Sequence, residues 1–250
     1  MKQRLLSLGF WLFIAVTSFL LFPVAVLIWL VTWPFDRRRV LLHRFTCFWA
    51  SLYTWLNPAW HVTLHGRERI DDSRAVVLVA NHLSLLDILV LFRLFKHYKW
   101  VSKIENFRVP LIGWNMSMNG YIKLKRGDRA SVLRMLRECE QAIGAGNSLM
   151  IFPEGTRSPT GRMRGFKPGA FEIALRTHAP VQPIALHGTH DALPKRGFVL
   201  QGRHEIEVRV LDPIPYETFA DQSAEELAER VRDRIAQELE AMAKQRAAGG

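Results

Sequence analysis

The stretch NHLSLLD, residues 81–87, places a histidine and an aspartate five positions apart, directly after the apolar run AVVLVA. A carboxylate that holds one ring nitrogen of a histidine allows the other nitrogen to act as a general base. On a regular helix, side chains five residues apart point roughly 140° away from each other. We therefore expect His82 on a loop between a strand and a helix. Asp87 would then lie in the first helical turn and reach back to the imidazole.

A simpler interpretation of the same stretch is structural. Ser84 and Asp87 match the N-cap and N3 positions of a capping box, so Asp87 could cap the helix while His82 is an incidental loop residue. The stretch alone leaves both interpretations open. A covalent nucleophile is not expected, because the sequence has no G-x-S-x-G and neither Cys47 nor Cys139 lies near a motif histidine.

A second loop whose side chains could take part in binding or catalysis is FPEGTRS, residues 152–158, which follows the apolar run SLMI. It contains a carboxylate, a glycine and a guanidinium, and an arginine fork suits bidentate binding of phosphate. Acids are scarce among the neighbouring cations, which favours an anion site over a simple ion pair or a solvated face. These cations are Lys123, Lys125, Arg126, Arg162, Arg164 and Lys167. A third segment, HGTH at residues 187–190, also follows an apolar run.

The N-terminus predicts attachment to a membrane. Residues 5–33 form a run of 29 residues without a charge, longer than the roughly 20 residues that a helix needs to cross a bilayer. Residues 40–60 are rich in aromatics, and their few polar groups fit a helix in the headgroup region. Two arrangements remain open, namely a single tilted span and a helical hairpin in one leaflet. The arginines at 37–39 predict that the domain that follows is cytoplasmic.

Composition narrows the class of partner. The chain has 250 residues, 49% of them hydrophobic, a formal net charge of +11 and two cysteines without C-x-x-C spacing. These cysteines favour neither a disulfide scaffold nor a thiolate zinc site. The positive charge suits an anionic membrane or acidic small molecules. Nucleic acid is not expected, because aromatic residues do not interleave with the cations as base stacking would require. No Walker A or G-x-G-x-x-G pattern is present, so no nucleotide cofactor is indicated.

Beyond residue 58, short apolar runs alternate with amphipathic segments. This pattern predicts an α/β fold with a mixed, largely parallel central sheet covered by helices on both faces. Sites in such sheets gather beyond the carboxyl ends of the strands. We expect a membrane-anchoring segment over 1–58 and a catalytic domain over 59–250. The predicted strands are Trp60–Leu64, Ala75–Ala80, Lys99–Ser102, Gly120–Leu124, Ser148–Phe152, Val181–Leu186 and Glu205–Val210. The predicted helices are Asp87–Lys96, Asp128–Ile143, Phe171–Thr177 and one that starts at the capping box Ser223–Glu226.

The chain resembles the glycerolipid acyltransferases of the 1-acyl-glycerol-3-phosphate O-acyltransferase family. NHLSLLD matches the first family motif, N-H-x-x-x-x-D, and FPEGTRS matches the third closely. GYIKLKR at 120–126 resembles the second motif, although Lys125 stands where an aspartate is common. VQPIAL at 181–186 is similar to the fourth. The segments 103–114 and 166–171 also resemble the family. The resemblance covers roughly residues 60–215 and keeps the motifs in order.

The resemblance implies a mechanism without metal, cofactor or acyl-enzyme. His82, oriented by Asp87, would take the proton from a lysophospholipid hydroxyl as this hydroxyl attacks an acyl thioester. The acceptor would be the sn-2 hydroxyl of 1-acyl-glycerol-3-phosphate and the product phosphatidic acid. Acyl-CoA or acyl-carrier protein would be the donor. The implied substrate-binding residues are Arg126, Glu154, Gly155, Thr156, Arg157 and Lys167, of which Glu154 and Gly155 would shape the acceptor loop.

Other functions remain open at this level. The same chemistry could act on another lysolipid, such as a lyso-ornithine lipid. A membrane-anchored binder of lipid or acyl-carrier protein is an alternative from another class, but a binder has no need of a base. The resemblance and the charge pattern together imply the inner membrane, with the catalytic domain on its cytoplasmic side.

Overall fold

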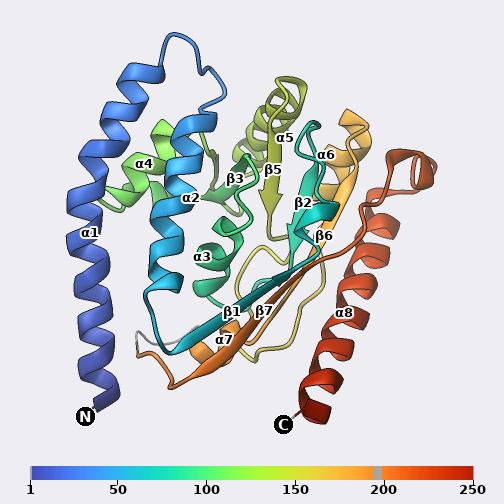
Figure 1. The fold of residues 1–250 in the computed structure, drawn as a ribbon. Helices are drawn as coiled ribbons and strands as arrows, with labels where there is room; N and C mark the ends of the chain where they lie inside the picture. The colour runs from blue at the N-terminus through green and yellow to red at the C-terminus, as the bar shows by residue number, and fades with distance from the viewer. Residues whose placement is uncertain (1, 194–198, 250) are drawn as a thin grey trace.

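The computed structural model describes residues 2–193 and 199–249 and contains one seven-stranded sheet with helices on both faces (Figure 1). The strand order is β1-β7-β6-β2-β5-β3-β4. Every neighbouring pair is parallel except β6 and β7, which are antiparallel. The predicted fold class is therefore confirmed. The strands are β1 Trp60–His65, β2 Val77–Ala80, β3 Tyr98–Lys103, β4 Ile122–Leu124, β5 Ser148–Ile151, β6 Val181–His187 and β7 His204–Val210.

The central strand β2 is buried along its whole length between β5 and β6. Leu78 and Ala80 face a core that includes residues of α2 and α3. Val77 and Val79 face a second core formed with α5, α6 and α8. A strand with both faces covered must be apolar at every position, which explains the uninterrupted run AVVLVA. The carboxyl end of β2 delivers NHLSLLD to the middle of the sheet edge.

Side-chain caps mark the starts of two helices, α5 and α8. The Asp128 side chain accepts the amide of Ser131 (3.0 Å) and caps α5. The capping box before α8 forms as predicted, with Ser223 N donating to Glu226 Oε2 (2.7 Å) and Glu226 N to Ser223 Oγ (3.1 Å). The helices are α1 Lys2–Thr32, α2 Val40–Trp55, α3 Leu86–Phe92, α4 Ile112–Met118, α5 Arg129–Gly144, α6 Gly169–Thr177, α7 Thr189–Ala192 and α8 Ala224–Gly249.

The helix predicted over 87–96 is shorter than expected, because α3 ends at Phe92. Phe95 adopts a left-handed conformation with φ 50°. Lys96 then turns inward, and its ammonium donates to the carbonyl oxygens of Asp71 (2.6 Å) and Arg74 (3.1 Å). The strand predicted from Gly120 begins only at Ile122, since Gly120 has φ 66° and Tyr121 N still donates to Met116 O. Local turns of the backbone therefore set the end of α3 and the start of β4.

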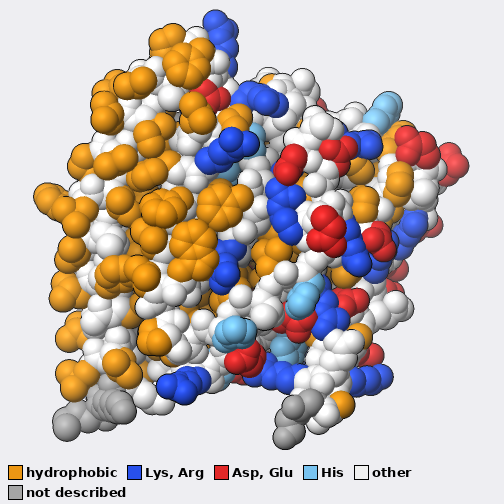
Figure 2. Space-filling model, in the orientation of Figure 1, with side chains coloured by type: hydrophobic (Ala, Val, Ile, Leu, Met, Phe, Trp, Pro, Cys, Tyr) orange, Lys and Arg blue, Asp and Glu red, His pale blue; other side chains and the backbone are white. Residues whose placement is uncertain are grey.

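The N-terminal helices α1 and α2 form an antiparallel hairpin along one side of the domain (Figure 1). Its outer face is apolar, and Figure 2 shows hydrophobic side chains covering it. Among the described residues, α1 is the one helix that length and composition would allow to cross a bilayer. This apolar face indicates association with a membrane. Its exposed residues include Leu8, Leu12, Phe19, Leu27, Phe48 and Trp55.

The expectation that the polar groups of α2 face lipid headgroups is wrong for most of them, although Arg44 is exposed. His43 is fully buried, and its Nδ1 lies 2.8 Å from Tyr121 Oη. Thr46 Oγ1 lies 3.1 Å from Asn119 Nδ2, also inside the domain. Burial lowers the pKa of His43 well below its usual value, so the ring is neutral. These side chains dock α2 onto the sheet layer, because a buried polar group needs a partner.

Candidate active site

The strand end that carries NHLSLLD is tied to its neighbour by Asn81. The Asn81 side chain donates from Nδ2 to Leu186 O (2.9 Å) and accepts from Leu186 N at Oδ1 (2.8 Å). Both hydrogen bonds are buried and join the carboxyl ends of β2 and β6. The loop that follows, residues 81–85, therefore starts from a rigid point on the sheet. It presents His82 immediately beyond the strand, as predicted.

His82 and Asp87 are hydrogen-bonded, with 2.9 Å between Nδ1 and Oδ2. Oδ2 also accepts the amides of Leu83 (2.6 Å) and Ser84 (2.8 Å). Asp87 thus holds the loop before the helix and the histidine ring at the same time. Because the carboxylate accepts at Nδ1, the lone pair of the neutral imidazole lies on Nε2. The side chain of His82 is 13% exposed and that of Asp87 0% exposed.

The capping box predicted for this helix forms only in part. Ser84 N donates to Asp87, but Ser84 Oγ accepts from Leu86 N (3.1 Å) instead of from the amide of Asp87. Ser84 Oγ donates in turn to Leu193 O (2.6 Å). The helix begins at Leu86, one residue later than the pattern implies. The hydrogen bond to Leu193 O draws the Ser84 side chain away from the amide of Asp87.

An aromatic residue fixes the face of the imidazole. The rings of His82 and Phe152 are stacked, with centroids 3.9 Å apart and an angle of 9° between their planes. Trp100 lies behind Phe152 at 5.4 Å. The sequence placed Phe152 at a strand end and at the start of FPEGTRS, but gave it no role beside the histidine. Its position directly before PEGTRS was the available signal, since the end of β5 lies next to the end of β2.

Glu154 joins the two loops. Its Oε1 accepts His82 N (2.7 Å) and its Oε2 accepts Arg164 N (3.0 Å). Ser158 N donates to His82 O (2.9 Å), so His82 is held by both of its backbone groups. Glu154 is 3% exposed, and burial raises its pKa to about 7 against the opposing effect of the two amide donors. The carboxylate is thus occupied in shaping the loop.

The remaining motif residues lie in the loop after β5, except Arg126, which lies at the edge of the sheet. Gly155 has φ 71°, and a methyl group there would lie 3.4 Å from Lys167 Nζ, so the lysine runs across the glycine. Thr156 and Arg157 are half-buried in the same loop. Arg126 is exposed on the turn after β4, at the edge of the sheet. Three strand spacings separate β4 from β2, roughly 14 Å at the usual separation.

HGTH lies beside the same loops. It follows β6, which is the neighbour of β2, and the ring of His190 packs against Gly161. A methyl group on Gly161 would approach His190 Cδ2 to 2.9 Å. Among the residues that the structure describes, no three histidine, cysteine or carboxylate side chains are grouped as a metal site would need.

Comparison with known proteins agrees with this geometry. Residues 61–187 match the family model described as Acyltransferase. A 1-acyl-sn-glycerol-3-phosphate acyltransferase of Chlamydomonas reinhardtii is 37% identical over 82% of this chain and 62% of its own length. An enzyme of the same name from Cocos nucifera is 31% identical over 85% of this chain and 70% of its own length. The chain therefore belongs to the acyltransferase family.

A solved structure has the same fold. The crystal structure of the 1-acyl-sn-glycerophosphate (LPA) acyltransferase from Thermotoga maritima superposes with a TM-score of 0.77 at 24% identity. The match covers 96% of this chain and 98% of that one. The chain spans about three fifths of the length of three plant and algal relatives that it matches, at 56–62%.

Proposed function

We propose that this protein transfers an acyl chain from a thioester donor to the sn-2 hydroxyl of 1-acyl-glycerol-3-phosphate and so makes phosphatidic acid. The observation that carries the proposal is the His82–Asp87 pair, in which a buried carboxylate holds Nδ1 and leaves Nε2 as the base. The names of the curated relatives support this choice of acceptor. Acyl-CoA and acyl-carrier protein are the two donors that suit a basic surface.

The reaction proceeds by direct transfer. His82 Nε2 takes the proton of the acceptor hydroxyl while its oxygen attacks the thioester carbonyl. The tetrahedral intermediate collapses to the new ester, and the departing thiolate takes the proton from the imidazolium. Asp87 stabilises that imidazolium at 2.9 Å. Phe152 holds the ring in one plane, so that Nε2 keeps a constant direction toward the acceptor.

The acceptor phosphate binds to the cations of the loop after β5. Arg157 supplies the bidentate fork and Lys167, which lies across Gly155, supplies a second charge. Both belong to the loop that Glu154 and Ser158 tie to His82. The phosphate is thereby placed at a defined distance from the base. Thr156 lies in the same loop, and Arg126 would add a positive charge from the turn after β4, at the edge of the sheet.

Residues 1–58 act as the membrane anchor and 59–250 as the catalytic domain. The hairpin lies in one leaflet, since α1 contacts the domain at two well-separated points along its length. Ser7 Oγ accepts Leu200 N (2.9 Å), and the ring of Phe22 packs on Trp114 (5.7 Å). A helix fastened in this way could not cross the bilayer without drawing the domain into it. The arginines at 37–39 favour the cytoplasmic side.

The activity is tested with purified protein in mixed micelles. A panel of lysolipids is offered with acyl-CoA and with acyl-carrier protein, and thioester consumption is measured. Preferred use of 1-acyl-glycerol-3-phosphate, abolished in His82→Ala, is the expected result. Faster transfer to another lysolipid would refute the proposed acceptor. No transfer to any lysolipid would leave lipid binding as the function.

The topology is tested separately with a tag at the C-terminus. This tag should become accessible only after the cells are opened.

A further inference from the structure

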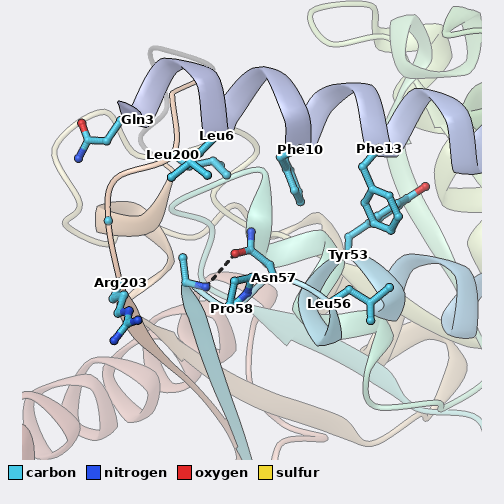
Figure 3. A pocket seen from close by; sticks show the side chains of 12 residues that line it. Gln3, Leu6, Phe10, Phe13, Tyr53, Leu56, Asn57, Pro58, Leu200 and Arg203 are labelled. Carbon is cyan, nitrogen blue, oxygen red and sulfur yellow. Dashed lines mark hydrogen bonds between the residues drawn. The ribbon is translucent and has the colours of Figure 1, made fainter. Parts of the chain in front are cut away.

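A cavity of about 460 Å³ lies between the hairpin and the catalytic domain (Figure 3). This volume falls within the roughly 300–1,000 Å³ that is common for ligand pockets. Gln3 and Arg203 lie at one end, and Phe13 and Tyr53 at the other. The apolar wall is formed by Leu6, Phe10, Phe13, Tyr53, Leu56 and Leu200.

The interior is suited to a hydrocarbon chain. Tyr53 presents its ring, because its hydroxyl is already occupied by Trp49 Nε1 (2.6 Å) and Thr17 Oγ1 (3.0 Å). Asn57 Oδ1 accepts the amide of Ala59 (3.0 Å). The Tyr53 hydroxyl and the Asn57 side-chain carbonyl oxygen are thus already hydrogen-bonded, and Gln3 and Arg203 lie at one end. A ligand with an apolar chain and a polar head fits such a lining.

The mouth of the cavity belongs to the membrane-facing surface. Leu6 and Leu56 line the cavity, yet they are 61% and 62% exposed. They continue the apolar face of the hairpin, which indicates association with a membrane. A chain that lies in the bilayer can therefore enter between α1 and the end of α2 without passing through water.

The opposite wall of the cavity is connected to the loop that carries His82. The backbone N–H of Gln201, next to Leu200, donates to Ala192 O (3.1 Å). Leu193 O in turn accepts Ser84 Oγ (2.6 Å), and Ser84 is part of NHLSLLD. Leu200 belongs to the same core cluster as Leu193 and Leu86. Two hydrogen bonds and one shared core thus connect the cavity wall with the loop that carries His82.

We propose that this cavity holds the acyl chain that the acceptor lysolipid already carries. The proposal rests on the proposed function and deepens it. A lysolipid reaches the enzyme with its chain in the bilayer, and the cavity keeps that chain in apolar surroundings while the head group moves to His82. Each methylene so buried changes affinity about fourfold. A thioester donor arrives from the aqueous side, so its chain does not enter through this mouth.

The test narrows the mouth with Leu6→Trp. Leu12→Trp is the matched control, since Leu12 lies on the same helix, is also 61% exposed and does not line the cavity. KM is measured for 1-acyl-glycerol-3-phosphate with a long and with a short chain in mixed micelles. Leu6→Trp should raise KM for the long-chain acceptor roughly tenfold, equivalent to about two excluded methylenes, and leave the short-chain KM unchanged. The control should change neither value.

Leu56→Trp repeats the test from the other wall, in case Leu6→Trp disturbs the hairpin. An altered preference for donor chain length would assign the cavity to the donor and overturn the proposal. Equal effects on long and short acceptors, or none, would overturn it too. Equilibrium binding of long-chain 1-acyl-glycerol-3-phosphate to Leu6→Trp and Leu12→Trp, measured without donor, tests the chain site independently of activity. If wild-type protein transfers to no lysolipid, the proposed function fails, while weaker binding by Leu6→Trp than by Leu12→Trp still supports the chain site.

Discussion

Replacement of Asp87 by Asn removes the charge of the carboxylate and keeps its shape. The three groups that donate to Asp87, His82 Nδ1 and the amides of Leu83 and Ser84, all meet Oδ2. Among the described residues, Oδ1 has no hydrogen-bond partner. An asparagine can therefore place its amide oxygen at the position of Oδ2 and retain all three contacts. The amide nitrogen then takes the place of Oδ1, where it is buried without a partner. We expect the protein to stay folded, with a free energy of unfolding lower by about 1–3 kcal/mol.

The loss in rate follows from the charge that develops on His82. In the transition state an imidazolium lies 2.9 Å from the carboxylate. At an effective dielectric constant of 20 this attraction amounts to about 6 kcal/mol. A neutral amide acceptor keeps about 1–1.5 kcal/mol of it. The difference of about 4 kcal/mol corresponds to a rate roughly 10³-fold lower, within the 10²–10⁴-fold span that is typical of general-base catalysis.

The assay is initial-rate thioester consumption by Asp87→Asn, His82→Ala and the double variant, with thermal melts as a folding control. The two single losses should be strongly non-additive, because the residues act as one unit. Near-normal turnover of Asp87→Asn in a protein that still melts cooperatively would refute the argument and leave Asp87 with a structural role alone. Near-normal turnover of His82→Ala would refute the whole mechanism.

Arg157→Ala should raise the acceptor KM roughly tenfold to a hundredfold and leave the donor KM unchanged, since charge-assisted hydrogen bonds contribute about 1.5–3 kcal/mol. Arg157→Lys should recover only part of this affinity; equal losses for both substrates would assign the arginine elsewhere. Glu154 has a folded pKa of about 7, above its ordinary value of 4.5, so the folded state keeps this proton longer than the unfolded state. Its contribution to stability should therefore fall by up to about 3 kcal/mol between pH 4.5 and pH 7. Melts of Glu154→Gln should lack this component, and identical pH profiles for both proteins would contradict it.

Local sequence determined where most elements lie and which loops carry the chemistry. The uninterrupted run before NHLSLLD could only be a strand covered on both faces, and its loop therefore lay at the sheet edge where sites form. Asp128 and Ser223 marked the starts of α5 and α8, because a cap depends on residues within one turn of itself. The charge-free run at 5–33 predicted association with a membrane from its length and composition.

Other features depended on partners far away in the chain. Glu154 was expected to shape the acceptor loop, but its acceptance of the His82 amide joins residues 72 positions apart. The ring of Phe152 stacks on the imidazole of His82 only because β5 lies next to β2 in the sheet. His43 and Thr46 appeared suited to lipid headgroups until Tyr121 and Asn119 provided buried partners. A polar side chain has the same local pattern whether it meets water or a distant residue, and only the packed fold decides between the two.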